Sequence, residues 1–489
     1  MIEEGRFADA AREMEELGIQ KLDKGERVEA ETLFSMLPRE IAEASVDLCF
    51  NLMLLKRLLG DLDSFTRLNN RIIQMREIYR EGTPERKKLE NRIFCAMLCQ
   101  PLSGGSNLLL NLAVLSSENP DASFTPARLS ITGKFPSVLR GAKDLSGITK
   151  YYRAITSMVR PMLGAFLEEY GAGVCETAIA ELLYEKNDMS GAAVHAGAAL
   201  EATNPEIAFA ALALLARIGA VDATSKQPAR ILRHLEEMLE KKSAYWLKPN
   251  YEALRARFYI LNGELDKVKD WADGCGMNDL ESLTLQDSYI LITKAKAYIA
   301  TGEHINAATL LARLSLFMEK EGRPLDMAEC LVHEAIVCEQ MGSPDAALQK
   351  LGQAMLLMQE YDYIRVFADC GKPLFNLISR YGKETPLPDG LHENYAAKIT
   401  GAAKAYAALY PSLYKTDNGA GDKTADNGFT KSELDVLRLL ETGKTNKVIA
   451  QELHIEVTTA RFHVSNIMKK LGVSNRTEAA HRAKDMNIL

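Results

Sequence analysis

One spacing recurs along much of the chain: a helical pattern ends at Gly or Asn, and a small or apolar residue follows five positions later. Gly or Asn adopts the left-handed backbone conformation that ends a helix, and a small residue lets the next helix pack closely against the first. The pattern therefore predicts a series of helical hairpins. The six pairs are Gly25 and Ala30, Gly60 and Phe65, Asn187 and Ala192, Gly263 and Val268, Gly302 and Ala307, and Gly342 and Ala347.

The turns also repeat at a regular interval. The last three are 39 and 40 residues apart, and the gap from Asn187 to Gly263 is 76 residues, close to two such periods. This arrangement resembles tetratricopeptide repeats, whose usual length is about 34 residues. The resemblance covers most of residues 1–100 and 165–380. A helical bundle without repeats is the alternative interpretation.

Residues 101–147 interrupt the pattern. They are rich in Pro, Gly and Ser, which predicts long connecting segments. A long irregular segment inside a repeat array is often functional, but an irregular repeat explains this stretch equally well.

A second interruption, KTDNGAGDKTADNG at 415–428, contains no large apolar residue and is typical of a flexible linker. A new apolar pattern begins at Phe429. We therefore expect an all-α chain in three parts. These are a tetratricopeptide-like region over residues 1–410, a linker over 411–428 and a four-helix domain over 429–489.

Helix-capping residues define the four helices of the last part. Thr430 with Glu433 and Asn475 with Glu478 are capping pairs, and Thr445 can cap a helix alone. A short helix, a tight turn and a longer helix form a helix-turn-helix, whose second helix enters the major groove of double-stranded DNA. The expected helices span about 431–443, 446–453, 457–471 and 475–485.

Charge supports this interpretation. The third expected helix, 457–471, has no acidic residue but contains Arg461, Lys469 and Lys470. Residues 429–489 hold ten Lys and Arg against seven Asp and Glu, a net charge of +3, so the rest of this chain of net charge -7 carries -10. A cationic helix on an acidic protein favours contact with phosphate. A solvated charged face is the alternative.

The motifs TNKVIAQEL, TTARFHVSNIMKKLGV and NRTEA occur in register, and with them this domain resembles the LuxR-type helix-turn-helix family. The resemblance implies phosphate contacts, base contacts and dimer contacts from the last helix. The implied phosphate contacts are Asn446, Lys447, Thr459 and His463, and the implied base contacts are Arg461, Phe462 and Ser465. Thr458 and Lys469 complete the outward face of the third helix and the predicted DNA-binding set.

The two parts together resemble the C-terminal part of the large, ATP-binding, maltotriose-activator-like LuxR regulators, whose repeats sense a small molecule or a protein. We expect their nucleoside-triphosphatase module to be absent. Two phosphate-loop-like fragments, GKT at 443–445 and TGKF at 132–135, have Arg438 and Arg128 where the loop requires an earlier Gly. We therefore expect no cofactor. No metal is expected either, because no His or third Cys lies near Cys95 and Cys99.

A cytoplasmic location is expected. The eight cysteines are scattered without a CxxC pair, as in a reduced protein. The first residues, MIEEGRFADAAREMEEL, lack the apolar stretch of a signal peptide. The longest uncharged helical run, IAFAALALLA, is far shorter than the ~20 residues that span a bilayer. No membrane association is predicted.

The sequence thus predicts a DNA-binding transcriptional regulator, acting as an activator. An effector, a small molecule or a protein, is expected among the helices of about residues 165–380. RNA polymerase and a second copy of the chain, as a homodimer on DNA, are the other expected partners. The alternative is a repeat scaffold for protein–protein interaction with an accessory DNA-binding domain. An enzyme is not expected, because the sequence shows no paired carboxylates, metal-spaced His and Cys, or nucleophile elbow.

Overall fold

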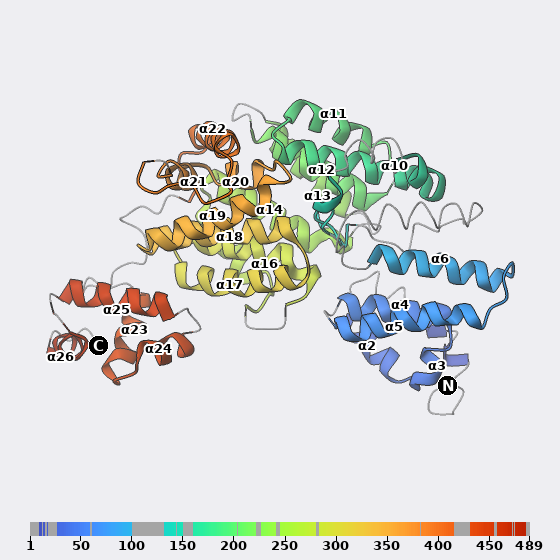
Figure 1. Ribbon diagram of the computed structural model, residues 1–489, viewed down its shortest axis with the longest axis horizontal. Helices are drawn as coiled ribbons and strands as arrows, with labels where there is room; N and C mark the ends of the chain where they lie inside the picture. The colour runs from blue at the N-terminus through green and yellow to red at the C-terminus, as the bar shows by residue number, and fades with distance from the viewer. Residues whose placement is uncertain are drawn as a thin grey trace. The chain divides into compact units, whose positions relative to one another are not determined.

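The computed structural model of the chain describes residues 9–11, 13–14, 17, 27–58, 61–99, 132–142, 144–149, 160–202, 204–221, 226–240, 245–279, 283–381, 383–414, 431–453, 457–471, 473 and 475–485. These residues form helices joined by turns and connecting segments, and they contain no β-strand beyond two isolated bridges (Figure 1). The expected all-α fold is confirmed. No helix in these ranges combines the length and the apolar composition that a membrane crossing requires.

The chain divides into two compact units. The first contains Met1–Glu252, Leu280–Tyr289 and Glu321–Arg323, and the second contains Ala253–Asp279, Ile290–Lys320 and Pro324–Leu489. The second unit thus includes the later repeats and the C-terminal helices together. The predicted domain limits are a different division and stay predictions.

The first unit begins with short helices packed around large apolar side chains. They are α2 (Arg27–Ser35), α3 (Arg39–Ala42), α4 (Val46–Leu58), α5 (Leu62–Gln74), the 3-10 turn η1 (Met75–Glu77) and α6 (Pro84–Cys99). α4 packs against α5 and α6, around a core that includes Phe50 and Phe65. Ala30 and Phe65, expected at close helix contacts, are both buried. Gly25 and Gly60 lie outside the described residues.

Residues 160–359 hold a run of helical hairpins. In order, the helices are α10 (Arg160–Glu185), α11 (Met189–Ala199), α12 (Pro205–Gly219), α13 (Gln227–Glu240), α14 (Lys248–Asn262), α15 (Leu265–Gly274), α16 (Ser288–Thr301), α17 (His304–Lys320), α18 (Pro324–Gln340) and α19 (Pro344–Gln359), with the short turns η4 (Tyr245–Leu247) and η5 (Leu285–Asp287) among them. The short helix α8 (Ser146–Thr149) precedes this run. α10 packs against α11 and α12, and α18 packs against α17 and α19. The 76-residue interval from Asn187 to Gly263 contains the extra hairpin α12–α13, as two periods require.

The four described turns of the predicted pattern share one geometry. Asn187, Gly263, Gly302 and Gly342 all have a positive φ, between 68° and 84°. The following N–H donates to the carbonyl five positions back, which is the Schellman arrangement that ends a helix. These bonds join Asp188 to Leu183 (2.8 Å), Glu264 to Tyr259 (2.9 Å), Glu303 to Tyr298 (2.8 Å) and Ser343 to Cys338 (2.8 Å). The residues five positions after the turns are all fully buried: Ala192, Val268, Ala307 and Ala347. The predicted hairpins are confirmed at these four turns.

Residues 132–142 and 144–146 form a packed connecting segment in the first unit. The carboxylate of Glu181 on α10 accepts hydrogen bonds from two consecutive backbone N–H groups of the segment, at 3.1 and 2.6 Å. The guanidinium of Arg323 donates to two consecutive carbonyl oxygens of the segment, at 2.9 and 3.0 Å. Side chains distant in sequence therefore hold the backbone of this segment. Residues 101–131, the rest of the predicted irregular stretch, lie outside the described residues.

Three charged side chains meet in the second unit, and we call them the Glu329 cluster: Arg257 of α14, Lys296 of α16 and Glu329 of α18. Arg257 Nη1 and Lys296 Nζ lie 3.0 and 2.7 Å from the same carboxylate oxygen of Glu329. Arg257 Nε also donates to the hydroxyl of Thr293 at 2.8 Å. Burial lowers the pKa of the Lys296 ammonium, although the charge of Glu329 acts in the opposite direction. The cluster thus joins three first helices of successive hairpins by largely buried ion pairs.

The repeat region ends with α20 (Arg365–Ala368), α21 (Gly371–Ile378) and α22 (Glu393–Leu409), and α22 packs against both of the others. Packed residues continue beyond α22, because Leu413 and Tyr414 are buried. Of the predicted linker, residues 415–428 lie outside the described residues, while its first four positions belong to this packed end.

Candidate nucleic-acid interface

The C-terminal helices begin with α23 (Lys431–Glu441), whose apolar face includes the buried Leu437 and Leu440. Gly443 ends the helix with a φ of +76°, a conformation that Gly adopts without strain. Both features agree with the expected first helix. Thr430, its predicted cap, lies outside the described residues.

α24 (Asn446–Glu452) follows after a short turn. The hydroxyl of Thr445 accepts a hydrogen bond from the N–H of Val448 at 3.4 Å, so Thr445 is the predicted N-cap. Ile449 is fully buried and anchors this short helix to the domain core. α24 packs against α25 (Val457–Leu471), the longer helix, and the two form the expected helix-turn-helix.

One face of α25 is buried. Ala460, Val464, Ile467 and Leu471 all belong to the apolar core of the domain, at the three- and four-residue spacing of a helix. Arg461, which follows the first of them, is exposed to solvent. The buried stripe therefore orients α25 with Arg461 away from the core.

α26 (Arg476–Asp485) completes the domain and packs against α23 and α25. Asn475 Oδ1 accepts a hydrogen bond from the N–H of Glu478 at 2.9 Å, and Asn475 Nδ2 lies 3.4 Å from the carboxylate of Glu478. This confirms the capping pair predicted from the sequence. Ala479 and Ala483 fill the contact of α26 with the core.

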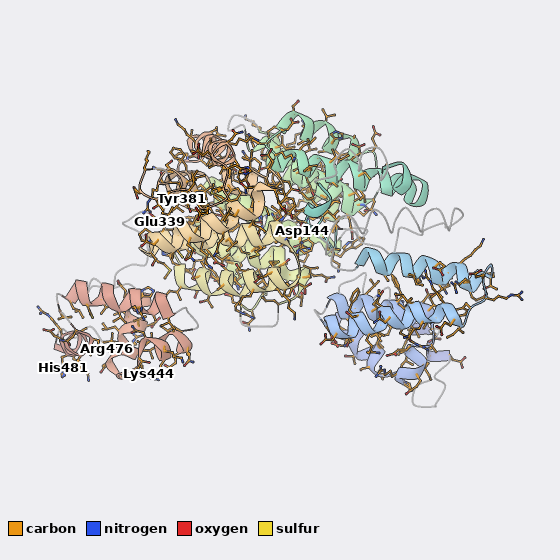
Figure 2. The ribbon with its side chains drawn as sticks, in the orientation of Figure 1. Asp144, Glu339, Tyr381, Lys444, Arg476 and His481 are labelled. Atoms are coloured by element: carbon orange, nitrogen blue, oxygen red, sulfur yellow. The ribbon has the colours of Figure 1, made fainter. Side chains whose placement is uncertain are left out.

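One contact in this domain was not predicted from the sequence. Arg476 and Lys444 lie in the C-terminal domain (Figure 2). The guanidinium of Arg476 donates to the backbone carbonyl of Lys444, and the ammonium of Lys444 pairs with the carboxylate of Glu452. Arg476 thereby connects the start of α26 to the turn between α23 and α24. The carbonyl that it contacts lies 32 residues away in sequence, so no local sequence pattern predicts the contact. We interpret Arg476 as a residue that positions the helix-turn-helix.

Two predicted DNA-binding residues present exposed cationic side chains: Lys447 in the first turn of α24 and Arg461 in the second turn of α25. Within the described residues neither forms an ion pair, in contrast to Arg438 of α23, which lies 3.0 Å from Asp435. Exposed cations on two consecutive helices suit a partner rich in negative charge.

Two other predicted residues are less accessible. Asn446 is partly buried, and His463 is 8% exposed. Burial lowers the pKa of the His463 imidazole, although the charge of Glu433 acts in the opposite direction. His463 is therefore neutral at pH 7 and would meet a phosphate only through an N–H group. Its burial favours packing as its main role, and a phosphate contact stays a prediction.

The backbones of the other five predicted residues lie in α25, but their side chains are outside the described part of the structure. These residues are Thr458, Thr459, Phe462, Ser465 and Lys469. Their assignment as DNA contacts stays a prediction.

Comparison with protein families gives two matches on this chain. Residues 139–384 match the family described as MalT-like TPR region, which is half of the chain. Residues 427–483 match the bacterial regulatory proteins of the luxR family. The two matches coincide with the helical hairpins and with α23–α26.

Individual proteins match the same two regions. The HTH-type transcriptional regulator MalT of Vibrio campbellii is 21% identical over 302 residues, which cover 59% of this chain and 33% of MalT. The transcriptional regulatory protein LiaR of Bacillus subtilis is 53% identical over 99 residues, which cover 18% of this chain and 47% of LiaR. The spore germination protein GerE of Bacillus subtilis is 52% identical over 50 residues, 10% of this chain and 68% of GerE. The chain thus spans about a third of MalT and about half of LiaR.

Proposed function

Because this chain belongs to the family with a MalT-like TPR region and carries a helix-turn-helix domain of the luxR family of bacterial regulatory proteins, we propose that it regulates transcription by binding double-stranded DNA. α25 enters the major groove, and α24 supports it against the sugar-phosphate backbone. The observation that carries the proposal is the buried stripe of α25, which leaves Arg461 exposed, while the preceding helix α24 exposes Lys447.

The two cations have different roles in this proposal. Arg461 lies in the N-terminal half of α25, which approaches base edges in a helix-turn-helix, and Arg is the commonest reader of guanine through O6 and N7. Lys447 lies in the first turn of α24 and contacts phosphate, which positions the domain without reading sequence. Thr458, Thr459, Phe462, Ser465 and Lys469 extend the same interface along α25.

The repeat region is the regulatory part. Arrays of helical hairpins offer a long curved surface, and we propose that a small-molecule or protein effector binds among the helices of residues 165–380. The effector shifts the DNA-binding equilibrium by its differential affinity for two states of the chain. We further propose that the chain acts as an activator that engages RNA polymerase, and that α26 pairs two copies on half-sites about one helical turn apart.

A repeat scaffold with an accessory DNA-binding domain is the second candidate. The observation that favours it is the proportion of the chain involved: the repeat match covers residues 139–384, whereas the DNA-binding match covers residues 427–483. The two functions differ in whether sequence-specific DNA binding is the output.

The test is selection of duplexes from a random library with the full chain, followed by affinity measurements on an enriched duplex and on a scrambled one. Arg461→Ala should cost about 1–3 kcal/mol on the enriched duplex and much less on the scrambled one. Arg438→Ala, which removes an exposed arginine of the same domain from α23, is the matched control and should change neither affinity.

Equal losses on both duplexes would limit Arg461 to phosphate contact. Failure of the full chain to enrich any duplex would contradict the proposed function and favour the scaffold.

A further inference from the structure

The last described residue before α23 is Tyr414, and its side chain is held inside the second unit. Tyr414 is 6% exposed, although it follows the end of α22 by only a few residues. Its neighbour Leu413 is also buried and packs close to Gly371 at the start of α21. In the sequence, residues 415–430 then lead to α23. The DNA-binding helices are therefore tethered from a point inside the repeat region's packed end.

Tyr414 makes three contacts with α18. Its hydroxyl lies 3.1 Å from His333 Nε2, and the two rings meet edge to face with centroids 5.7 Å apart. Its backbone carbonyl accepts a hydrogen bond from the side-chain amide of Gln340 at 3.1 Å. A side-chain and a main-chain contact thus fix both the ring and the backbone of Tyr414 against one helix.

The direction of the Tyr414–His333 bond follows from the other side of the imidazole. His333 Nδ1 lies 2.7 Å from the backbone carbonyl of Glu329, which can only accept a hydrogen bond, so Nδ1 carries the proton. Nε2 is then the acceptor, and the Tyr414 hydroxyl donates to it. Full burial lowers the pKa of His333 to about 3, which agrees with a neutral ring. The Tyr414–His333 contact is therefore a hydrogen bond between two uncharged groups, with the hydroxyl as donor and the imidazole as acceptor.

The backbone of Tyr414 indicates that this position is imposed by packing. Its φ is +51°, in the left-handed region that a residue with a bulky side chain rarely occupies. Such a conformation persists only where surrounding contacts outweigh its cost. The contacts with His333 and Gln340 are the ones that this structure offers.

The same helix connects Tyr414 to the Glu329 cluster. Glu329 and His333 are one helical turn apart on α18, and the backbone carbonyl of Glu329 orients the His333 ring. The side chain of Glu329 holds Arg257 and Lys296 from the two preceding first helices. A change in the arrangement of these helices therefore acts on the residue that receives Tyr414.

We propose that Tyr414 anchors the start of the linker to α18, and that the repeat region controls DNA binding by holding or releasing this anchor. The proposal rests on the proposed function, since it concerns the route by which the repeat region regulates the DNA-binding domain. Holding Tyr414 fixes the point from which the chain continues toward α23, and release frees that point. Because coupling between sites is reciprocal, DNA binding must in turn change the occupancy of the anchor.

Tryptic cleavage of the full chain measures how often Tyr414 leaves its contacts with α18. Lys415 follows Tyr414 in the sequence, so we expect trypsin to cleave at Lys415 only when Tyr414 leaves α18. Lys423 lies farther along the linker sequence and serves as an internal reference. Tyr414→Phe removes the hydroxyl and should raise the ratio of cleavage at Lys415 to cleavage at Lys423 at least about fivefold.

Tyr395→Phe is the matched control. The Tyr395 hydroxyl also makes a buried hydrogen bond in the same unit, to the carbonyl of Tyr363 at 2.5 Å, but Tyr395 lies in α22 and not at the linker. This variant should leave the cleavage ratio unchanged. Similar Lys415 to Lys423 cleavage ratios for the Tyr414 and Tyr395 variants would overturn the proposal that Tyr414 is an anchor.

The second arm adds a duplex enriched by the selection described above. In the unmodified chain, saturating duplex should change the Lys415 to Lys423 ratio, and in Tyr414→Phe the change should disappear. An unchanged ratio in the unmodified chain, despite tight binding of the duplex, would overturn control through the anchor while the proposed function stands. A chain that enriches no duplex would overturn the proposed function, and the control of DNA binding with it.

Discussion

The interior of the second unit and the C-terminal helix-turn-helix use charge in opposite ways. In the repeat region, Arg257 and Lys296 are turned inward and share the carboxylate of Glu329. In the C-terminal domain the core cluster is apolar, and Lys447 and Arg461 are exposed. The comparison separates two kinds of cation: those that hold the protein's own helices together and those that remain available to a partner.

The largest effect is expected on the free energy of unfolding when the Glu329 cluster is broken. Glu329→Gln keeps the shape of the side chain but leaves two cations without their shared counter-charge. Breaking a buried pair costs about 3–5 kcal/mol. We expect about 3 kcal/mol, at the lower end, because Arg257 and Lys296 keep 18% and 16% of their side chains exposed. The protein's two tryptophans, Trp246 and Trp271, lie in the repeat region, so tryptophan fluorescence during urea unfolding measures that region.

The control for this variant is an exposed ion pair of the same unit. Lys398 Nζ lies 2.9 Å from Asp362, with side chains 44% and 43% exposed. Lys398→Ala should therefore change the free energy of unfolding by at most about 1 kcal/mol. Comparable losses for Glu329→Gln and Lys398→Ala would mean that the inward-facing cations do not differ from surface charges.

A smaller effect is expected on the stability of α26 when its N-cap in the C-terminal domain is removed. Asn475→Ala removes the cap of α26, which should cost about 1 kcal/mol and raise local opening of that helix roughly fivefold. Hydrogen exchange of the α26 amides in the full chain measures this opening, and the amides of α18 in the same sample are the reference. Unchanged exchange in α26 would show that core packing through Ala479 and Ala483 alone holds the helix.

The two regions also differ in how far sequence predicts them. The capping residues Thr445 and Asn475 and the turn residue Gly443 act within four or five positions, and the structure ends α23 and begins α24 and α26 where these residues predict. The hairpin turns at Gly263 and Gly302 are equally local. Short-range signals of this kind depend on backbone conformation and one hydrogen bond, so they are visible in a single sequence.

Long-range contacts were not predicted. Glu181 reaches a backbone N–H group 42 residues earlier, and Arg323 reaches a carbonyl 183 residues earlier. The Tyr414–His333 contact spans 81 residues. A charged or aromatic residue within a helical pattern does not indicate which distant backbone or ring it meets. The buried position of His463 is a related case, because the motif implied a phosphate contact and the packing beside Glu433 became visible only in the structure.

The central claim is that the outward-facing cations meet DNA, and the salt dependence of binding tests it most directly. Each phosphate contact that is lost should flatten the slope of log affinity against log salt concentration by about one unit. Lys447→Ala in the full chain should therefore flatten this slope by about one on enriched and scrambled duplexes alike, whereas Lys398→Ala, an exposed lysine of the repeat region, should leave the slope unchanged. A slope for Lys447→Ala equal to that of the unmodified chain would contradict the assignment of this face to DNA.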